Sequence, residues 1–238
     1  DLLPALLDGM ANESDEACRF YAAWSAALLG HRAGVDGLKN LAETQSVHGR
    51  RACDMAVRRM DHGPAGNWLN TLGRQDSLTR WAIKGCGALG DPQAVSWLIE
   101  KMQTPALARS AGEAFSMITG VDLAYDDLDT DAPEGFEAGP TDDPDDEDVA
   151  MDPDEDLPWP APELIAAWWR DHRSRFQSGQ RYLAGRPITM EDCRQVLRNG
   201  FQRQRMAAAV EMALLQPGRS LFEVRAPGFQ QQRQLATT

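Results

Sequence analysis

The sequence has few of the residues from which metal and catalytic sites are built. Among its 238 residues are only four cysteines and four histidines. No cysteine–histidine set has zinc spacing, and no H-E-x-x-H, G-x-x-x-x-G-K-[ST] or G-x-S-x-G motif is present. A dinucleotide-binding G-x-G-x-x-G motif is not expected either. We therefore expect no metal site, no cofactor and no enzyme activity. The histidines, which we interpret as ordinary surface or core side chains, are His31, His48, His62 and His172.

The few cysteines also bear on the cellular compartment. They lie far apart and form no C-x-x-C pair, so we expect reduced thiols that pack as small apolar side chains. That state favours a reducing, cytoplasmic location. No uninterrupted apolar run approaches the roughly 20 residues of a membrane-spanning helix. The chain opens on Asp1 and then an apolar run, which favours a fragment of a longer protein. The cysteines are Cys18, Cys53, Cys86 and Cys193.

Basic residues are absent from one long segment. Between Val121 and Asp156 we count seventeen acidic residues and no lysine or arginine, while the formal net charge of the whole chain is −12. The acidity therefore belongs to this segment, and the rest of the chain is near neutral or basic. The segment is also rich in proline and glycine, so alone it cannot bury enough apolar surface to offset its ordering entropy. We interpret residues 121–161 as an acidic insertion.

The remainder of the chain has a regular helical period. Ala22, Ala52 and Ala82 are thirty residues apart, and Ala111 follows after twenty-nine. Small residues at these positions let stacked helices approach closely. Shorter amphipathic runs between them keep the same period, and a period of about 30 residues built from two helical patterns is typical of a helical solenoid. The main helices are predicted over Ser14 to Leu29, Ser46 to Met60, Asp76 to Leu89, and Thr104 to Ile118.

These boundaries divide the chain into four parts. Residues 1–120 are predicted as the repeats, and residues 162–216 as C-terminal helices with one more repeat-like pair, in which Thr189 caps a helix. Residues 217–238 form a glutamine- and arginine-rich tail. The predicted fold class is all-α, a solenoid interrupted by a long acidic loop. Glycines expected at helix ends are Gly30, Gly63, Gly73, Gly90 and Gly120.

One repeat carries a family resemblance. The run Ala82-Ile-Lys-Gly-Cys-Gly-Ala-Leu-Gly-Asp-Pro-Gln-Ala-Val-Ser-Trp-Leu resembles the pattern A-x-x-A-L-G-x-L-G-D-P-x-A-V-x-x-L of HEAT-like repeats of the phycobilin-lyase type. Ser110 to Leu123, followed by an acidic loop and a Trp-Trp helix, further resembles an uncharacterised family of bacterial HEAT-like proteins that are often encoded near type VI secretion clusters. The resemblance implies a solenoid whose second helices line the concave side, in a bacterial setting, and it implies no chemistry.

Two sets of charged residues are candidates for partner binding. The first set consists of basic residues on three successive repeat helices, namely the arginines of one helix and Arg80, Lys84 and Arg109 of the next two. These side chains are either exposed charges that pair locally, or they face a groove. In the second case the insertion folds back over them or competes with an acidic ligand. The insertion itself is a solvated linker, an acidic docking element or, less favoured because it lacks the D-x-[DN]-x-[DN]-G register, a calcium site. The candidate residues are Arg50, Arg51, Arg58, Asp142, Asp143, Asp145, Asp146, Glu147 and Asp148.

Two tryptophans and the overall pattern complete the functional hypotheses. Trp168 and Trp169 either pack a helix onto the core or form a partner hot spot.

The sequence favours a non-enzymatic adaptor or scaffold whose partner is another protein encoded nearby. One alternative is an immunity-type inhibitor whose acidic insertion blocks a basic toxin. Another, by analogy with bilin lyases, is an enzyme subunit. Nucleic acid is disfavoured as a partner, because the insertion would repel phosphate.

Overall fold

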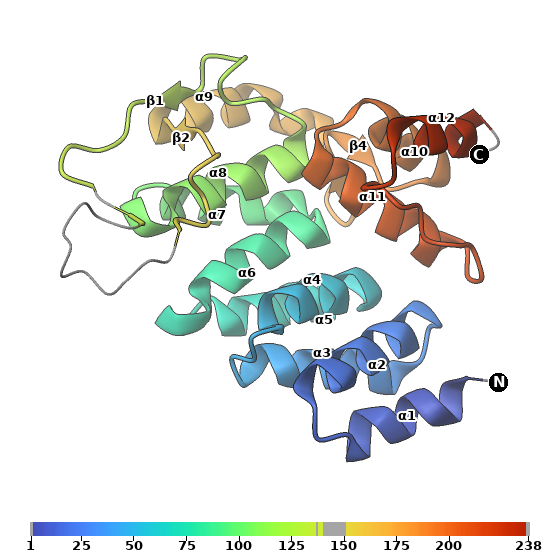
Figure 1. Cartoon of the computed structure of the whole chain (residues 1–238). Coiled ribbons are helices and arrows are strands. Elements are labelled where there is room, and N and C mark those ends of the chain that lie inside the picture. Colours follow the sequence, from blue (N-terminus) through green and yellow to red (C-terminus); the bar gives the residue numbers. More distant parts are fainter. Residues whose placement is uncertain (1, 137, 140–150, 237–238) are drawn as a thin grey trace.

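The protein is an all-α helical-repeat fold, as predicted, in which consecutive helices stack from the N-terminus upward (Figure 1). This arrangement comes from a computed structural model, which describes residues 2–136, 138–139 and 151–236. The two helices of each pair pack together, and each second helix also packs on the second helix of the next pair. The pairs are α1 (Leu3–Asn12) with α2 (Glu16–Leu28), α3 (Arg32–Glu43) with α4 (Gly49–Arg59), α5 (His62–Leu72) with α6 (Asp76–Leu89), and η1 (Pro92–Ala94) and α7 (Val95–Lys101) with α8 (Pro105–Thr119).

Small residues allow the second helices to stack closely. Ala52, Ala82 and Ala111, which mark the sequence period, have no exposed surface. A Cβ added to Gly87 of α6 would lie only 3.0 Å from the Cα of Ala114 in α8, so a larger residue would force the two helices slightly apart. The period read from the alanines is therefore the period of helix stacking.

The predicted helix limits agree closely with the structure, with two corrections. Gly63 does not end a helix. Only two residues separate α4 from α5, and Gly63 is the second residue of α5. Residues 217–238 contain a helix, α12 (Gly228–Ala236), where only a tail was expected. This helix forms because Leu235 packs against the C-terminal core and the Leu235 carbonyl accepts a hydrogen bond from Arg198 at 3.1 Å.

Both ends of the acidic insertion are packed against the solenoid. The short strand β1 (Asp129–Thr130) pairs antiparallel with β2 (Trp159–Pro160), so the insertion leaves and returns at the same place beside α8 (Figure 1). The side chains of Leu123, Leu128 and Leu157 are buried there. These leucines supply the apolar contact that the acidic sequence around them lacks.

A β-hairpin closes the carboxyl ends of α6 and α8. It follows α9 (Pro162–His172) and η2 (Arg173–Arg175) and consists of β3 (Tyr182–Leu183) and β4 (Arg186–Pro187). The helix ends Gly90 and Gly120 have positive φ angles of 74° and 77°. A Cβ added at Gly90 would lie 2.1 Å from the Tyr182 carbonyl oxygen, so this helix end needs glycine for its backbone angle and for the approach of the hairpin.

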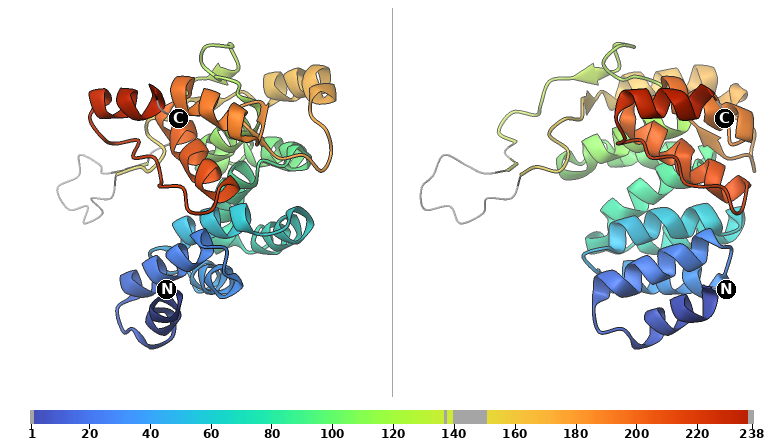
Figure 2. Two further views of the ribbon diagram at one scale, coloured as in Figure 1. Left: turned by 90° about the vertical axis from the view of Figure 1, so that its right-hand side faces the viewer. Right: turned by 45° about the vertical axis from the view of Figure 1, so that its right-hand side comes forward.

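The C-terminal helices form a second core beside the upper solenoid (Figures 1 and 2). Helix α10 (Met190–Asn199) packs on α11 (Gln202–Leu215), and the Thr189 hydroxyl caps α10 by accepting a hydrogen bond from the Asp192 backbone N–H at 3.1 Å. None of the helices in the described part of the chain is long and apolar enough to span a membrane. The cysteines are free, as expected; Cys53, Cys86 and Cys193 are buried, but Cys18 is exposed, because α2 presents it to solvent.

Candidate functional site

Charged side chains recur at equivalent positions on three successive second helices. Arg50, Arg80 and Arg109 each lie two residues before the alanine that marks their repeat, and a second row lies four residues, or one helical turn, further along. Because second helices stack in order, these side chains form one surface, which we call the second-helix face. It comprises Arg50, Asp54 and Arg58 of α4, Arg80 and Lys84 of α6, and Arg109 and Glu113 of α8.

The end of the acidic insertion lies on this face. We call residues 151–157 the anchoring segment, and its central side chain is Asp154, which is only 3% exposed. One carboxylate oxygen of Asp154 pairs with Arg80 and accepts a hydrogen bond from the Ser110 hydroxyl at 2.7 Å. The other oxygen lies 3.4 Å from Nζ of Lys84. The Asp154 carboxylate is therefore held by two helices, α6 and α8.

Arg109 is the second point of attachment. Its guanidinium donates a hydrogen bond to the Asp154 carbonyl oxygen at 2.9 Å and pairs with the carboxylate of Asp152. The Asp152 carboxylate also accepts a hydrogen bond from the Asp154 backbone N–H at 2.9 Å, which closes a tight turn around Pro153. The guanidinium lies 4.5 Å from the ring of Trp159, a cation–π distance. Two carboxylates two residues apart thus share one compact basic site.

These contacts change the proton affinities of the groups involved. Burial raises the pKa of Asp154, but the Ser110 hydrogen bond and the charges of Lys84 and Arg80 outweigh it, so the net pKa is lowered. Burial also raises the pKa of Asp152, and the Asp154 backbone N–H and Arg109 outweigh it in the same way. The pKa of Lys84 is lowered by burial despite the attraction of Asp154. Both carboxylates are therefore ionised ligands of the site at neutral pH.

The anchoring segment covers only part of the second-helix face. Arg80, Lys84 and Arg109 pair with the carboxylates of Asp152 and Asp154, and the charge of Lys84 also acts on Asp54 and Glu113 of the same face. Arg50, one repeat earlier, is exposed and has no hydrogen bond or ion pair within the described residues. The insertion therefore does fold back over the later arginines, and it leaves the first one open.

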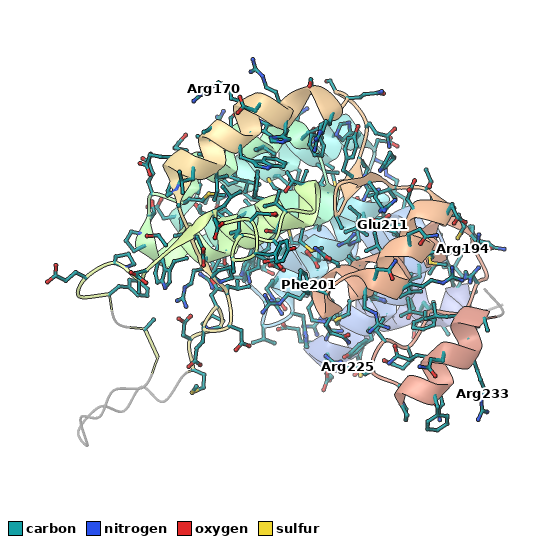
Figure 3. All side chains as sticks on the ribbon, turned by 90° about the horizontal axis from the view of Figure 1, so that it is seen from above. Arg170, Arg194, Phe201, Glu211, Arg225 and Arg233 are labelled. Atoms are coloured by element: carbon teal, nitrogen blue, oxygen red, sulfur yellow. The ribbon has the colours of Figure 1, made fainter. Side chains whose placement is uncertain are left out.

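Arg58 occupies a different environment from the other candidate arginines. Its guanidinium is buried and lies 2.6 Å from the carboxylate of Glu211, which also lies 2.6 Å from the guanidinium of Arg181. Glu211 belongs to α11 and lies where the C-terminal helices meet the solenoid (Figure 3). Arg58 therefore joins two parts of the chain and is not exposed to a partner.

Arg51 packs on an aromatic cluster of α2. Its guanidinium lies 4.8 Å from the ring centre of Phe20 and 5.4 Å from that of Tyr21, and it donates a hydrogen bond to the Tyr21 hydroxyl at 3.2 Å. The Arg51 residue as a whole remains exposed. It borders the open end of the second-helix face.

The two tryptophans have the geometry of core packing. Trp168 meets the ring of Phe115 edge to face with centroids 5.6 Å apart, and it stacks on His172 at 4.2 Å. Trp169 lies 5.3 Å from Phe176. Both tryptophans are half-buried against the main core. They fix α9 on the solenoid.

The predicted acidic run lies outside the described residues, which stop at 139 and resume at 151; its members are Asp142, Asp143, Asp145, Asp146, Glu147 and Asp148. The sequence pointed to the insertion through its high number of acidic residues. That number does not distinguish Asp152 and Asp154, which contact the face, from the other fifteen acids of the segment. Within the described ranges, no group of three or more His, Cys, Asp and Glu side chains is arranged to hold a metal ion.

A glycine pattern in α6 needs a separate explanation. Residues 85–90 read G-x-G-x-x-G, the letters of a dinucleotide-binding motif, so the expectation that the chain lacks this pattern was wrong. That motif functions between a strand and the start of a helix. Here the first two glycines lie in the last turns of α6, where Gly85 contacts Leu69, and Gly90 ends the helix. The pattern serves helix packing.

A cleft with a volume of about 550 Å³ lies between α5, the α6–α7 turn and residues 178–179. His62 and Asp91 face each other there, with Nε2 of His62 2.8 Å from the Asp91 carboxylate. Cys86 also lines the cleft, but burial, with the charge of Asp91, raises its pKa to about 12. A thiol with this pKa is a poor nucleophile at neutral pH.

Comparison with known proteins adds no family assignment. The chain matches no protein-family model, no curated protein and no solved structure. The HEAT-like resemblance therefore stays a prediction from the sequence.

Proposed function

We propose that this protein is a non-enzymatic adaptor or scaffold that binds an acidic segment of another protein on its second-helix face. The observation that supports this proposal is that the face already holds an acidic segment, Asp152 to Asp154, through Arg80, Lys84, Arg109 and Ser110. Stacked helices offer a long surface for such binding. The setting that we propose, bacterial type VI secretion or effector handling, rests on the family resemblance alone.

The open Arg50 gives this proposal a specific test. The chain is immobilised and exposed to an extract of its source organism, and captured proteins are identified by mass spectrometry at low and moderate salt. The Arg50→Glu variant should lose a partner that the wild-type chain captures, whereas Arg170→Glu should retain it. Arg170 is a matched control because it is an exposed arginine that points outward from α9 (Figure 3). Equal capture by all three chains would refute binding through the second-helix face.

A second candidate function is inhibition of a basic protein by the insertion. The described part of the insertion before residue 137 carries five exposed acids that form no ion pair within the described residues: Asp126, Asp127, Asp129, Asp131 and Glu134. They present uncompensated negative charge, which would attract a basic toxin surface. A variant with residues 140–150 replaced by a glycine–serine linker and these five acids replaced by their amides should then fail to capture the basic partner. The Arg50→Glu variant should still capture it.

A further inference from the structure

We infer that the basic site formed by Arg80, Lys84, Arg109 and Ser110 recognises an acidic turn of a partner protein with two carboxylates two residues apart, and that the anchoring segment is its built-in competitor. This inference rests on the proposed function, since it names the partner's chemistry and the regulation of the same face.

The site is organised around two carboxylates in a fixed arrangement. Ser110 and Arg80 hold the Asp154 carboxylate, while Arg109 contacts both the Asp152 carboxylate and the Asp154 main chain. Arg109 is buried, and Trp159 forms a wall beside it. A planar guanidinium held in place recognises a carboxylate with more directional contacts than a free lysine would. The donors therefore select an Asp-x-Asp arrangement and not negative charge in general.

The segment that occupies the site does not use the whole face. Its two carboxylates contact Arg80, Lys84 and Arg109, whereas the exposed Arg50 makes no hydrogen bond or ion pair among the described residues. Packed helices lie about 8–10 Å apart, and an extended chain spans about 3.3–3.6 Å per residue. A partner segment with a further acid about three residues from its Asp-x-Asp pair would therefore reach Arg50. It would gain a contact that residues 151–157 do not make.

Tethering raises the occupancy of the site by the anchoring segment. The anchoring segment is fixed on one side by β2 and α9, so its effective concentration at the site is on the order of millimolar or higher. A short acidic peptide without an additional contact should compete poorly. A partner segment that also reaches Arg50 should displace it, which makes binding selective for the longer acidic sequence.

The direct test uses a fluorescent peptide with the sequence of residues 151–158, Met-Asp-Pro-Asp-Glu-Asp-Leu-Pro. Fluorescence anisotropy measures its binding to the full-length wild-type chain and to the Asp152→Asn/Asp154→Asn variant. We expect saturable binding to the variant and at least tenfold weaker binding to the wild type, whose site is occupied. Adding Arg80→Gln to the variant should abolish binding, whereas adding Arg170→Gln should not. A peptide with asparagine at both anchoring positions is the ligand control.

Three results would overturn the inference: no saturable binding to a folded variant, equal binding to wild type and variant, or equal binding of the asparagine peptide. If the double variant does not fold, hydrogen exchange on the wild-type chain replaces it. Excess peptide should then accelerate exchange of the backbone amides of residues 151–157, and unchanged exchange at saturating peptide would count against the inference.

The outcomes also separate this inference from the proposed function. A partner whose capture depends on Arg50, but is no tighter with Asp152→Asn/Asp154→Asn, would support the adaptor and refute the internal competitor. Peptide binding to the opened site, with no partner lost on Arg50→Glu, would support the acidic-segment site and refute the adaptor as proposed.

Discussion

Over α6 and α8 the second-helix face is covered by the anchoring segment, whereas over the first turns of α4 it is open. Arg80 and Arg109 pair with Asp154 and Asp152, but Arg50, at the same position of the preceding repeat, makes no hydrogen bond or ion pair among the described residues. The other end of α4 is covered again, because Glu211 lies against Arg58. The arginines of one repeating pattern thus have three different environments.

This difference teaches that the repeat fixes the position of a side chain but not its role. Each arginine is placed by local helix stacking, which the period of about 30 residues specifies. Whether it is then covered depends on segments far away in the sequence, the insertion for Arg80 and α11 for Arg58. Breaking each covering contact separately measures how much each environment contributes.

The largest effect is expected from Glu211→Ala. Removing this carboxylate leaves the guanidinium groups of Arg58 and Arg181 close together and without their counter-charge in a buried site. Losing one partner of a buried ion pair costs about 3–5 kcal/mol. Urea unfolding should show a loss of that size in the free energy of unfolding. The matched control is Glu163→Ala, which removes an exposed acid from the first turn of α9 and should change the free energy by less than about 0.5 kcal/mol. A loss for Glu211→Ala similar to the control would contradict the assigned role of Glu211.

A smaller loss is expected from Asp154→Ala. The change leaves Arg80, Lys84 and Ser110 without their shared acceptor, but Arg80 and Lys84 keep partial contact with water. An unsatisfied polar group of this kind costs about 1–3 kcal/mol. Glu155→Ala, at the exposed neighbouring position, is the control and should be nearly neutral. Chemical denaturation of the wild type, Asp154→Ala and Glu155→Ala measures these differences in the free energy of unfolding. If both variants lose the same stability, the contacts of Asp154 do not hold the anchoring segment on the face.

The same contact predicts a pH dependence. The pKa values of Asp152 and Asp154 lie below their ordinary value of 3.8 in the folded chain. Their stabilisation is therefore fully present above the unfolded pKa and is lost as the pH falls through the folded pKa. The difference in free energy of unfolding between wild type and Asp152→Asn/Asp154→Asn should be constant between pH 7 and about 5 and shrink below about pH 4. Comparing the two chains cancels the carboxyl groups that do not interact with this pair. Glu113 is not among them, because its pKa is raised by burial and also by the charge of Asp154. A difference that grows on acidification would refute the ion-pair assignment.

Much of the fold was predictable because helix stacking is local in sequence. Helix α6 runs from Asp76 to Leu89 as the sequence predicted, and α9 begins at Pro162 as predicted. Both limits are set by residues with strong end preferences, a glycine after one helix and a proline at the start of the other. The prediction that a helix ends at Gly63 was wrong, because the link between α4 and α5 has only two residues and Gly63 already lies within α5.

The candidate site was predictable only in part. The sequence placed Arg80, Lys84 and Arg109 on adjacent helices, and the fold-back of the insertion over them was one of two open alternatives. Which acids bind was not predictable, since Asp154 is 74 residues from Arg80 and 44 from Ser110. Glu211 lies still further, 153 residues from Arg58. Pairings over such distances depend on how the C-terminal helices dock, which no local pattern encodes.

The smallest expected effect separates the two neighbouring arginines of the open end. Arg51→Ala removes a guanidinium that lies on the Phe20 ring, and cation–π contacts at exposed sites contribute about 0.5–1 kcal/mol. Arg50→Ala removes a side chain without a partner in the described residues and should cost less than about 0.5 kcal/mol. Thermal unfolding of both variants, with Arg51→Lys as a charge-conserving control, resolves the difference. Arg51→Lys should be less stable than the wild type but more stable than Arg51→Ala, because a lysine keeps the charge and lacks the planar group that stacks on the ring. If Arg50→Ala proves the more destabilising, then Arg50 has a structural role, and the open end of the face is not free for a partner.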